Sequence, residues 1–185
     1  MLLASFAHTP TSDQTVLLRQ LSAFLASAKP NKTFLLKGFA GTGKTTVVSV
    51  LVNILPQLNL DSILLAPTGR AAKVLSTYSK QHALTIHKAI YKTNDGDSGF
   101  FLSLRENTHK NTVFIVDEAS MIAAETPEKH GLFPVSNILE DLMTYIFSGD
   151  NCSLIFVGDT AQLPPVGTNL SLALNLDYLK AAFHL

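Results

Sequence analysis

The chain is poor in charge and has almost no cysteine. Lys and Arg together number 14, as do Asp and Glu, so the formal net charge is zero and only 15% of residues are charged. This balance removes the simplest argument for a nucleic-acid partner, a strongly basic domain, but leaves local basic patches open. The single cysteine, Cys152, excludes an intramolecular disulfide and is typical of a reducing, cytoplasmic setting.

Long apolar runs are lacking as well, although 46% of the 185 residues are hydrophobic. No run approaches the roughly 18 residues that a membrane-spanning helix needs, and residues 1–7 lack the basic leading segment of a signal peptide. A chain of this length and apolar content can bury a sizeable core, which excludes wholesale disorder. We therefore expect a single domain over residues 1–185 and a cytoplasmic location.

Apolar periodicity predicts that strands and helices alternate along the chain. Four short and continuously apolar runs are expected as buried strands: residues 33–36, 62–66, 112–116 and 152–157. Helical spacing of apolar residues is found in five other segments: residues 14–28, 44–55, 69–80, 86–91 and 137–147. This order favours an α/β fold in which helices cover both faces of a mainly parallel sheet.

A glycine-rich segment between the first strand and the next helix, Gly38 to Thr45, fits the pattern G-x-x-x-x-G-K-[ST]. Such a loop turns backbone N–H groups toward phosphate oxygens, and the following helix adds the positive end of its dipole. Lys44 would reach the β- and γ-phosphates of a nucleotide, and the Thr45 hydroxyl would ligate Mg²⁺. The residues expected to bind the nucleotide here are Gly38, Ala40, Gly41, Thr42, Gly43, Lys44, Thr45 and Thr46.

An acidic pair follows the third predicted strand, because Asp117 and Glu118 come directly after the apolar residues 113–116. Ligands of open α/β sheets bind at the carboxyl ends of strands, so both carboxylates are expected beside the phosphate loop. Asp117 is a candidate Mg²⁺ ligand, directly or through water, and Glu118 is placed to orient or deprotonate an attacking water. A helix start that favours acidic residues is the alternative explanation.

The class of nucleotide-binding protein is indicated by four segments and their order along the chain. They are residues 38–45, 66–72 (Ala-Pro-Thr-Gly-Arg-Ala-Ala), 116–121 (Val-Asp-Glu-Ala-Ser-Met) and 158–167 (Gly-Asp-Thr-Ala-Gln-Leu-Pro-Pro-Val-Gly). Together they resemble motifs I, Ia, II and III of superfamily 1 DNA helicases. The most similar branch is RecD/Dda, which includes the alpha subunit of exodeoxyribonuclease V, and the Thr-Ile-His at residues 85–87 also resembles that branch. The resemblance implies a P-loop, RecA-like motor domain with three α/β/α layers.

The resemblance also implies roles for single residues. Gln162 matches the motif III glutamine that senses the γ-phosphate, and a loop amide held by its own turn is the alternative. Gln14 lies where these helicases keep a glutamine that reads the adenine edge, and a plain helix start is the alternative. Asp159 either helps to couple the nucleotide to DNA or caps the loop backbone. The catalytic residues expected are Lys44, Glu118 and Gln162, with Thr45 and Asp117 as metal ligands.

Motif Ia touches the DNA backbone in this family, and its counterparts here are Pro67, Thr68 and Arg70. A hydroxyl, backbone N–H groups at a helix start and a cation all suit phosphate. Residues 62–94 hold five cations and no acidic residue, so they form a candidate track for a single strand, to which Thr85 and His87 also belong. A solvated helix face is the alternative for this track, and a core position is the alternative for His87.

Residues 91–110 form an excursion from the alternating pattern. The cluster at residues 93–99, Thr-Asn-Asp-Gly-Asp-Ser-Gly, predicts a turn within a hairpin. The resemblance implies that this hairpin is the pin that separates the duplex, with Phe100 stacking on bases at the fork. The alternative is that Phe100 and Phe101 pack the hairpin onto the main domain.

As a whole, the resemblance implies an ATP-dependent DNA helicase that uses ATP and Mg²⁺ and moves 5′ to 3′ on single-stranded DNA. Its partners would be single-stranded and fork DNA and subunits of a nuclease complex, in DNA recombination and repair. Two rival functions are a P-loop phosphotransferase, which shares the phosphate loop, and an ATP-binding scaffold within a nuclease complex. An RNA helicase has similar motifs, but the details at residues 85–87 and 158–166 favour the DNA branch.

Helicases of this type bind ATP between two RecA-like domains and take an arginine finger from the second one. Residues 168–185 contain no arginine, so we expect the second motor domain to be missing from this chain. An arginine finger is worth about 10³–10⁵ in rate, so we also expect slow ATP hydrolysis by the chain alone.

Overall fold

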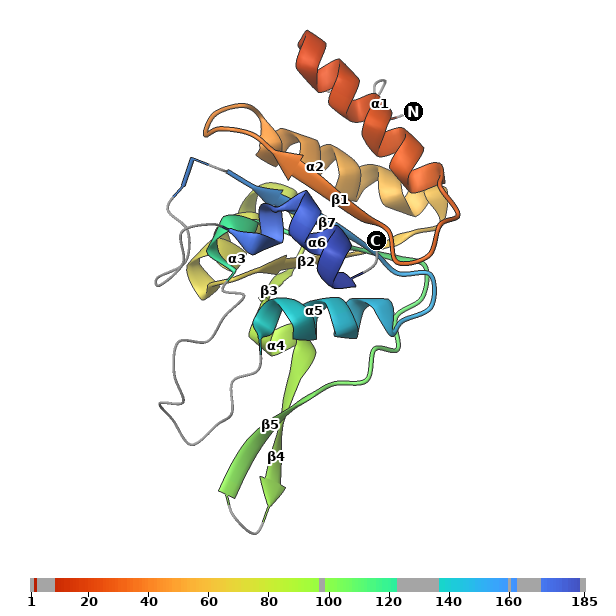
Figure 1. Cartoon of the computed structure of the whole chain (residues 1–185). Helices are drawn as coiled ribbons and strands as arrows, with labels where there is room; N and C mark the ends of the chain where they lie inside the picture. Colours follow the sequence, from red (N-terminus) through yellow and green to blue (C-terminus); the bar gives the residue numbers. More distant parts are fainter. Residues whose placement is uncertain are drawn as a thin grey trace.

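The computed structural model describes residues 2, 9–96, 99–122, 137–159, 161–162 and 171–183, and of residues 95, 96 and 99–101 the backbone alone. Five strands form a central sheet in the order β1-β7-β6-β2-β3, and each neighbouring pair is parallel (Figure 1). The strands are β1 (Thr33–Lys37), β2 (Asp61–Ala66), β3 (Ala83–Thr85), β6 (Thr112–Val116) and β7 (Ser153–Gly158).

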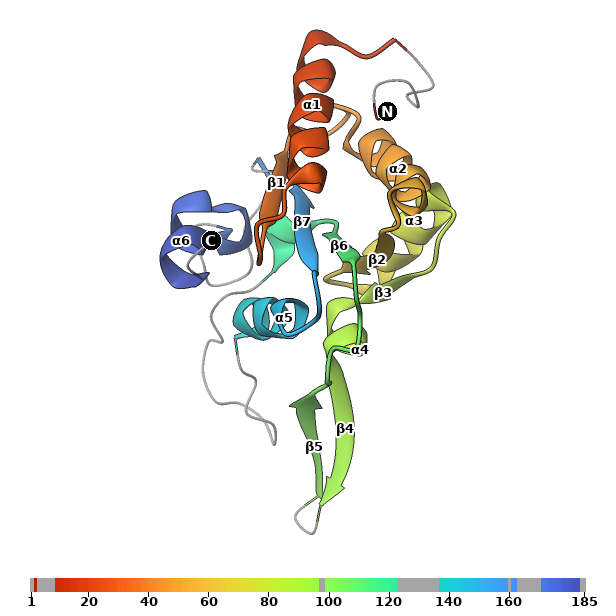
Figure 2. The same ribbon diagram turned by 90° about the vertical axis from the view of Figure 1, so that its right-hand side faces the viewer.

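Helices cover both faces of this sheet, as the sequence predicted (Figure 2). On one face lie α1 (Ser12–Ala26), α2 (Lys44–Ile54) and α3 (Gly69–Ser79). On the other lie α4 (Ile86–Ile90), α5 (Ile138–Phe147) and α6 (Leu176–Phe183). Short 3-10 segments are η2 (Leu55–Leu58), η3 (Ala119–Met121) and η4 (Leu172–Leu174). None of the helices in the described parts of the chain is long and apolar enough to cross a membrane.

The strands are continuously apolar because both of their faces are buried. In β6, Val113 and Ile115 belong to the core under α1, α2 and α3, whereas Phe114 and Val116 belong to the core under α4, α5 and α6. This alternation follows from the two-residue period of a strand. A parallel sheet covered on both faces therefore needs apolar side chains at every position of its central strands.

Replacing Phe156 with alanine should lower the free energy of unfolding by about 3–5 kcal/mol, since the change leaves a cavity in the core. Phe156 lies in β7 and is fully buried under α5 and α6. Urea unfolding followed by circular dichroism measures the change. The control is Val16→Ala on α1, where the side chain is 53% exposed and a change within about 0.5 kcal/mol is expected. Similar losses in both variants would contradict this assignment of the core.

A hairpin of β4 (Tyr91–Gly96) and β5 (Gly99–Leu104) forms a separate antiparallel sheet that projects from the body of the molecule (Figures 1 and 2). The hairpin is confirmed, but the predicted turn is too long, because residues 93–96 belong to β4. Cross-strand bonding overrides their local turn preference: the Asn94 amide donates to the Ser103 hydroxyl over 2.6 Å. The hairpin ends at Leu104, before the predicted limit at residue 110.

One strand and one α-helix were not predicted from the sequence, β3 and α6. The strand β3 has only three residues, and its apolar pattern is too short for a periodicity test.

The helix α1 begins two residues earlier than the sequence predicted. Thr11 caps the helix and exchanges hydrogen bonds with Gln14 in a capping box. At the other end of α1, the Lys32 ammonium donates to the carbonyl oxygens of Phe24, Leu25 and Ser27.

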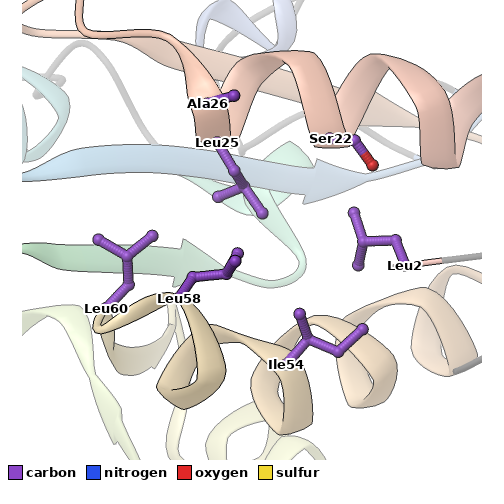
Figure 3. A pocket seen from close by; sticks show the side chains of 7 residues that line it. All are labelled: Leu2, Ser22, Leu25, Ala26, Ile54, Leu58 and Leu60. Carbon is purple, nitrogen blue, oxygen red and sulfur yellow. The ribbon is translucent and has the colours of Figure 1, made fainter.

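An apolar cavity of about 460 Å³ separates α1 from the end of α2 and η2 (Figure 3). Its lining residues are Leu2, Ser22, Leu25, Ala26, Ile54, Leu58 and Leu60. The Ser22 hydroxyl donates to the Leu18 carbonyl of its own helix over 2.8 Å, so the one polar side chain among the described lining residues is already paired. The cavity offers little to a phosphate, and it lies at the far end of α2 from the glycine-rich loop.

Candidate nucleotide and nucleic-acid site

The carboxyl ends of the five parallel strands bring the motif residues to one edge of the sheet. In the order β1, β7, β6, β2 and β3, the residues that end or follow the strands are Gly38, Asp159, Asp117, Pro67 and Thr85. These segments are far apart in the sequence, and only the crossover connections make them neighbours. Open α/β sheets bind their ligands at this edge.

The glycine-rich loop joins β1 to α2 and is shaped by its glycines. Gly41 and Gly43 have φ values of 78° and 89°, in the left-handed region that favours glycine. A Cβ at Gly38 would lie 2.7 Å from the Thr42 hydroxyl oxygen, which donates to the Phe39 carbonyl over 2.8 Å. The loop therefore turns tightly around its own backbone, as a phosphate-binding loop must.

Lys44 begins α2 and folds back over this loop. Its ammonium donates to the carbonyl oxygens of Gly38 and Phe39 over 2.6 and 2.9 Å. A flexible cation held at the mouth of the loop is in place to meet an anion there. The other predicted nucleotide ligands surround it: Ala40, Gly41, Thr42 and Thr45 are exposed, and Gly43 and Thr46 are half-buried.

Gln14 lies against the loop, although 28 residues separate it from Thr42 in the chain. Its amide nitrogen donates to the Thr42 carbonyl over 3.3 Å, and a Cβ at Gly43 would lie 2.8 Å from the same nitrogen. Its amide oxygen accepts from the Thr11 N–H over 3.1 Å. The helix-start interpretation is thus confirmed, and the same side chain also stands beside the predicted nucleotide pocket.

The acidic pair follows β6 as predicted, and its backbone is unusual. Glu118 has a φ of 52°, in the left-handed region that costs a side chain about 1–3 kcal/mol. The Glu118 N–H donates to Asp117 Oδ1 over 3.0 Å, and Asp117 Oδ2 accepts a hydrogen bond from the Tyr78 hydroxyl of α3. Such strain is found where a site requires a particular side-chain direction.

Tyr78 is a site residue that the motif comparison missed. Burial raises the pKa of Tyr78 well above its usual value, and the hydrogen bond to Asp117 raises it further. The Tyr78 hydroxyl therefore contacts one of the two candidate metal ligands, Asp117. In the sequence, the one signal for Tyr78 is its helical spacing from Ala71 and Val74, which places the three residues on one face of α3.

The two candidate metal ligands fit a magnesium nucleotide by their chemistry. Thr45 supplies a hydroxyl oxygen and Asp117 a carboxylate oxygen, and the Asp117 carboxylate accepts a hydrogen bond from the hydroxyl of Tyr78. Mg²⁺ takes hard oxygen ligands, keeps several waters, and is held by one or two protein groups together with substrate phosphates. The residues present therefore match this cation better than a metal that needs a cage of histidine or cysteine.

The motif III loop begins at Asp159 after β7, and Thr160 and residues 163–170 lie outside the described residues. Asp159 is 4% exposed, and its Oδ1 accepts from the Ala161 N–H over 2.8 Å, so it caps the loop backbone. The exposed Gln162 is held by the buried Ser120, whose hydroxyl donates to Gln162 Oε1 over 2.9 Å. Ser120 thus joins motif II to motif III, a contact that no spacing in the sequence indicated.

A cavity of about 350 Å³ joins the motif Ia segment to the acidic pair. Its lining residues are Thr68, Arg70, Ala71, Val74, Asp117, Glu118, Met121 and Gln162. The side chains of Val74 and Met121 are 55% and 46% exposed. The structure therefore brings two predicted DNA contacts, Thr68 and Arg70, to the same cavity as two predicted catalytic residues, Glu118 and Gln162.

The remaining predicted DNA contacts lie at two helix starts. Thr68 caps α3 by accepting from the Ala71 N–H over 3.2 Å, and Thr85 caps α4 by accepting from the Lys88 N–H over 3.2 Å. His87 is exposed, 5.7 Å from the ring of Tyr91, which excludes the alternative of a core histidine. Pro67 is half-buried and Arg70 exposed, and the side chain of Phe100 lies outside the described residues.

The basic residues of α3 and α4 also share a groove. Lys73, His82 and Lys88 line a hollow of about 480 Å³ with the hydroxyl groups of Ser76, Thr77 and Thr85. Cations and hydroxyl groups of this kind contact phosphates in nucleic-acid complexes. Gly69, which directly follows Thr68 in the chain, also lines this groove.

Comparison with known proteins places these features in context. A family described as an AAA domain matches residues 20–168. The ATP-dependent RecD2 DNA helicase of Deinococcus radiodurans is 28% identical over 163 residues, which cover 88% of this chain and 20% of that protein. The ATP-dependent DNA helicase dda of Enterobacteria phage T4 is 32% identical over 136 residues, which cover 71% of this chain and 28% of that protein.

Among solved structures, the Pif1 helicase from Candida albicans matches 85% of this chain and 34% of its own chain, with 20% identity and a TM-score of 0.49. The chain spans between 12% and 30% of the length of the curated relatives it matches.

Proposed function

Since this chain belongs to the AAA-domain family and carries the RecA-like domain of superfamily 1 helicases, we propose that it binds Mg-ATP and couples ATP hydrolysis to movement along single-stranded DNA. One observation carries the proposal: Lys44, Asp117, Glu118 and Gln162 converge at the carboxyl edge of the sheet, beside the motif Ia helix α3.

Each of these side chains has a distinct role in the proposed reaction. Lys44 binds the β- and γ-phosphates, which replace the Gly38 and Phe39 carbonyls as its partners. Thr45 and Asp117 would hold Mg²⁺, which would neutralise negative charge on the phosphates. Glu118 orients the attacking water and accepts its proton, and Gln162, held by Ser120, contacts the γ-phosphate. Gln14, beside the loop, contacts the adenine edge.

Single-stranded DNA would lie across the starts of α3 and α4. Thr68, Arg70, Thr85 and His87 contact its phosphates and sugars there, and the groove that holds Lys73 and Lys88 continues the path. The projecting β4–β5 hairpin would act as a strand-separating pin. A second RecA-like domain, in the same polypeptide or in a partner, would close over the nucleotide and supply an arginine finger. By family likeness, the direction of movement along single-stranded DNA is 5′ to 3′.

Two titrations test the proposal. A fluorescent ATP analogue should bind in the presence of Mg²⁺, and labelled oligo-dT should bind independently, each followed by fluorescence anisotropy. Binding of the nucleotide without oligo-dT would instead indicate a phosphotransferase. Binding of neither ligand would contradict the proposed function outright.

Replacing Arg70 with alanine should weaken oligo-dT binding and reduce its salt dependence. The loss of one phosphate contact on a single strand should lower the slope of log K against log salt by about 0.7. Anisotropy titrations at several salt concentrations measure this slope. Lys110→Ala is a matched control, because Lys110 is exposed at the opposite end of β6 and pairs only loosely with Asp150, at 3.9 Å. Equal effects in the two variants would show that the contact is not local to α3.

A further inference from the structure

Tyr78 lies outside the helicase motifs, yet its hydroxyl stands at the candidate metal site. It donates a hydrogen bond to Asp117 Oδ2. Asp117 directly follows β6, whereas Tyr78 belongs to a different element, α3. A side chain outside the motifs thus contacts the carboxylate that a magnesium nucleotide would use.

The tyrosine is itself held firmly in place. The Ser49 hydroxyl of α2 donates to the Tyr78 carbonyl oxygen over 3.2 Å, and the ring packs against the core under α2 and α3. At the other end of the contact, Asp117 Oδ1 accepts from the Glu118 N–H over 3.0 Å. Both oxygens of the carboxylate therefore have a donor, which fixes the rotation of the Asp117 side chain.

Tyr78 also lies on the face of α3 that points to the site. Ala71 and Val74 precede it by seven and four residues, so all three share one face of the helix. Ala71 and Val74 line the cavity that contains Asp117 and Glu118. The hydroxyl therefore reaches the carboxylate because the whole helix is oriented toward it.

On the premise that the proposed function holds, we propose that Tyr78 is a positioning residue for the metal site. Its hydroxyl orients the Asp117 carboxylate toward the magnesium nucleotide and acts through that carboxylate alone. Partners that orient a metal ligand typically change metal affinity by about 10- to 100-fold when they are removed. The contact uses one hydroxyl, so the lower end of that range, roughly tenfold, is expected.

The test compares Tyr78→Phe with Tyr91→Phe. The first change keeps the ring and removes the hydroxyl, and the second removes another tyrosine–aspartate bond, from Tyr91 to Asp141 at 2.6 Å, away from the nucleotide loop. Binding of a fluorescent ATP analogue is measured by anisotropy while Mg²⁺ is titrated, and again in EDTA. Tyr78→Phe should raise the half-maximal Mg²⁺ concentration about tenfold and leave binding in EDTA unchanged. Tyr91→Phe should change neither value.

Three other outcomes would overturn the inference. An unchanged Mg²⁺ midpoint in Tyr78→Phe would show that the hydroxyl does not position Asp117. A lower midpoint would show that it competes with the metal. An equal loss of binding with and without Mg²⁺, together with a lower melting temperature in nucleotide-free buffer, would show a structural role. In all three cases, Mg²⁺-dependent binding by the unaltered chain keeps the proposed function intact, whereas its failure there would contradict the proposed function itself.

Discussion

Replacing Lys44 with alanine should lower the affinity for Mg-ATP by at least about 100-fold, because each hydrogen bond to a charged group is worth about 1.5–3 kcal/mol and 1.4 kcal/mol is a factor of ten. The ammonium already lies at the mouth of the loop, 2.6 Å from the Gly38 carbonyl oxygen. A phosphate that enters the loop would meet this cation at once. Anisotropy with a fluorescent ATP analogue measures the affinity directly.

The control for this variant is Lys29→Ala, which removes an exposed lysine beyond the end of α1. It should bind the nucleotide as the unaltered chain does. A thermal melt without nucleotide checks that the loop survives the loss of the bonds from Lys44 to Gly38 and Phe39. If Lys44→Ala kept full affinity, the glycine-rich loop would not be the nucleotide site.

Replacing Glu118 with glutamine should slow ATP hydrolysis strongly while it preserves ATP binding. A positioned general base contributes about 10²–10⁴ in rate, so hydrolysis should fall by that factor. The amide keeps the shape of the side chain, and the backbone strain at a φ of 52° is unchanged. Single-turnover hydrolysis of labelled ATP, with the chain in excess, measures a slow rate, and anisotropy measures the affinity.

Glu140→Gln is the matched control, since Glu140 is exposed in the first turn of α5. It should leave both the rate and the affinity unchanged. If Glu118→Gln lost nucleotide affinity as strongly as it lost hydrolysis, Glu118 would act in binding rather than as the base. An unchanged rate would require another group to activate the water.

Much of the fold was predictable because its signals are local. The strand that became β6 was placed at its observed bounds, since a run of β-branched and aromatic residues between polar neighbours has few other solutions. The loop from Gly38 to Thr45 was recognised from glycines that only a tight turn needs. The turn at residues 93–96 was wrong because pairing with β5 outweighs the preference of single residues for turns.

A site residue could be predicted from the sequence only where it belongs to a local pattern of this kind. Lys44, Asp117 and Glu118 directly follow a loop or a strand, and the structure places them together at one edge of the sheet. Ser120 and Tyr78 belong to no such local signal, because their side chains contact residues that are 42 and 39 positions away in the chain. Contacts at such separations depend on how the helices cross the sheet, which no local pattern encodes.

The sequence by itself thus determined the class of fold, the phosphate loop, the acidic pair and the family to which they belong. Each of these depends on residues that are close along the chain, where hydrophobic period and backbone freedom act directly. Only the tertiary structure decided that Gln14 lies on the loop, that Asp159 caps its own turn, and that Tyr78 reaches Asp117. The physical reason is that the parallel order β1-β7-β6-β2-β3 gathers strand ends that are distant in the chain, and these side-chain contacts depend on that arrangement.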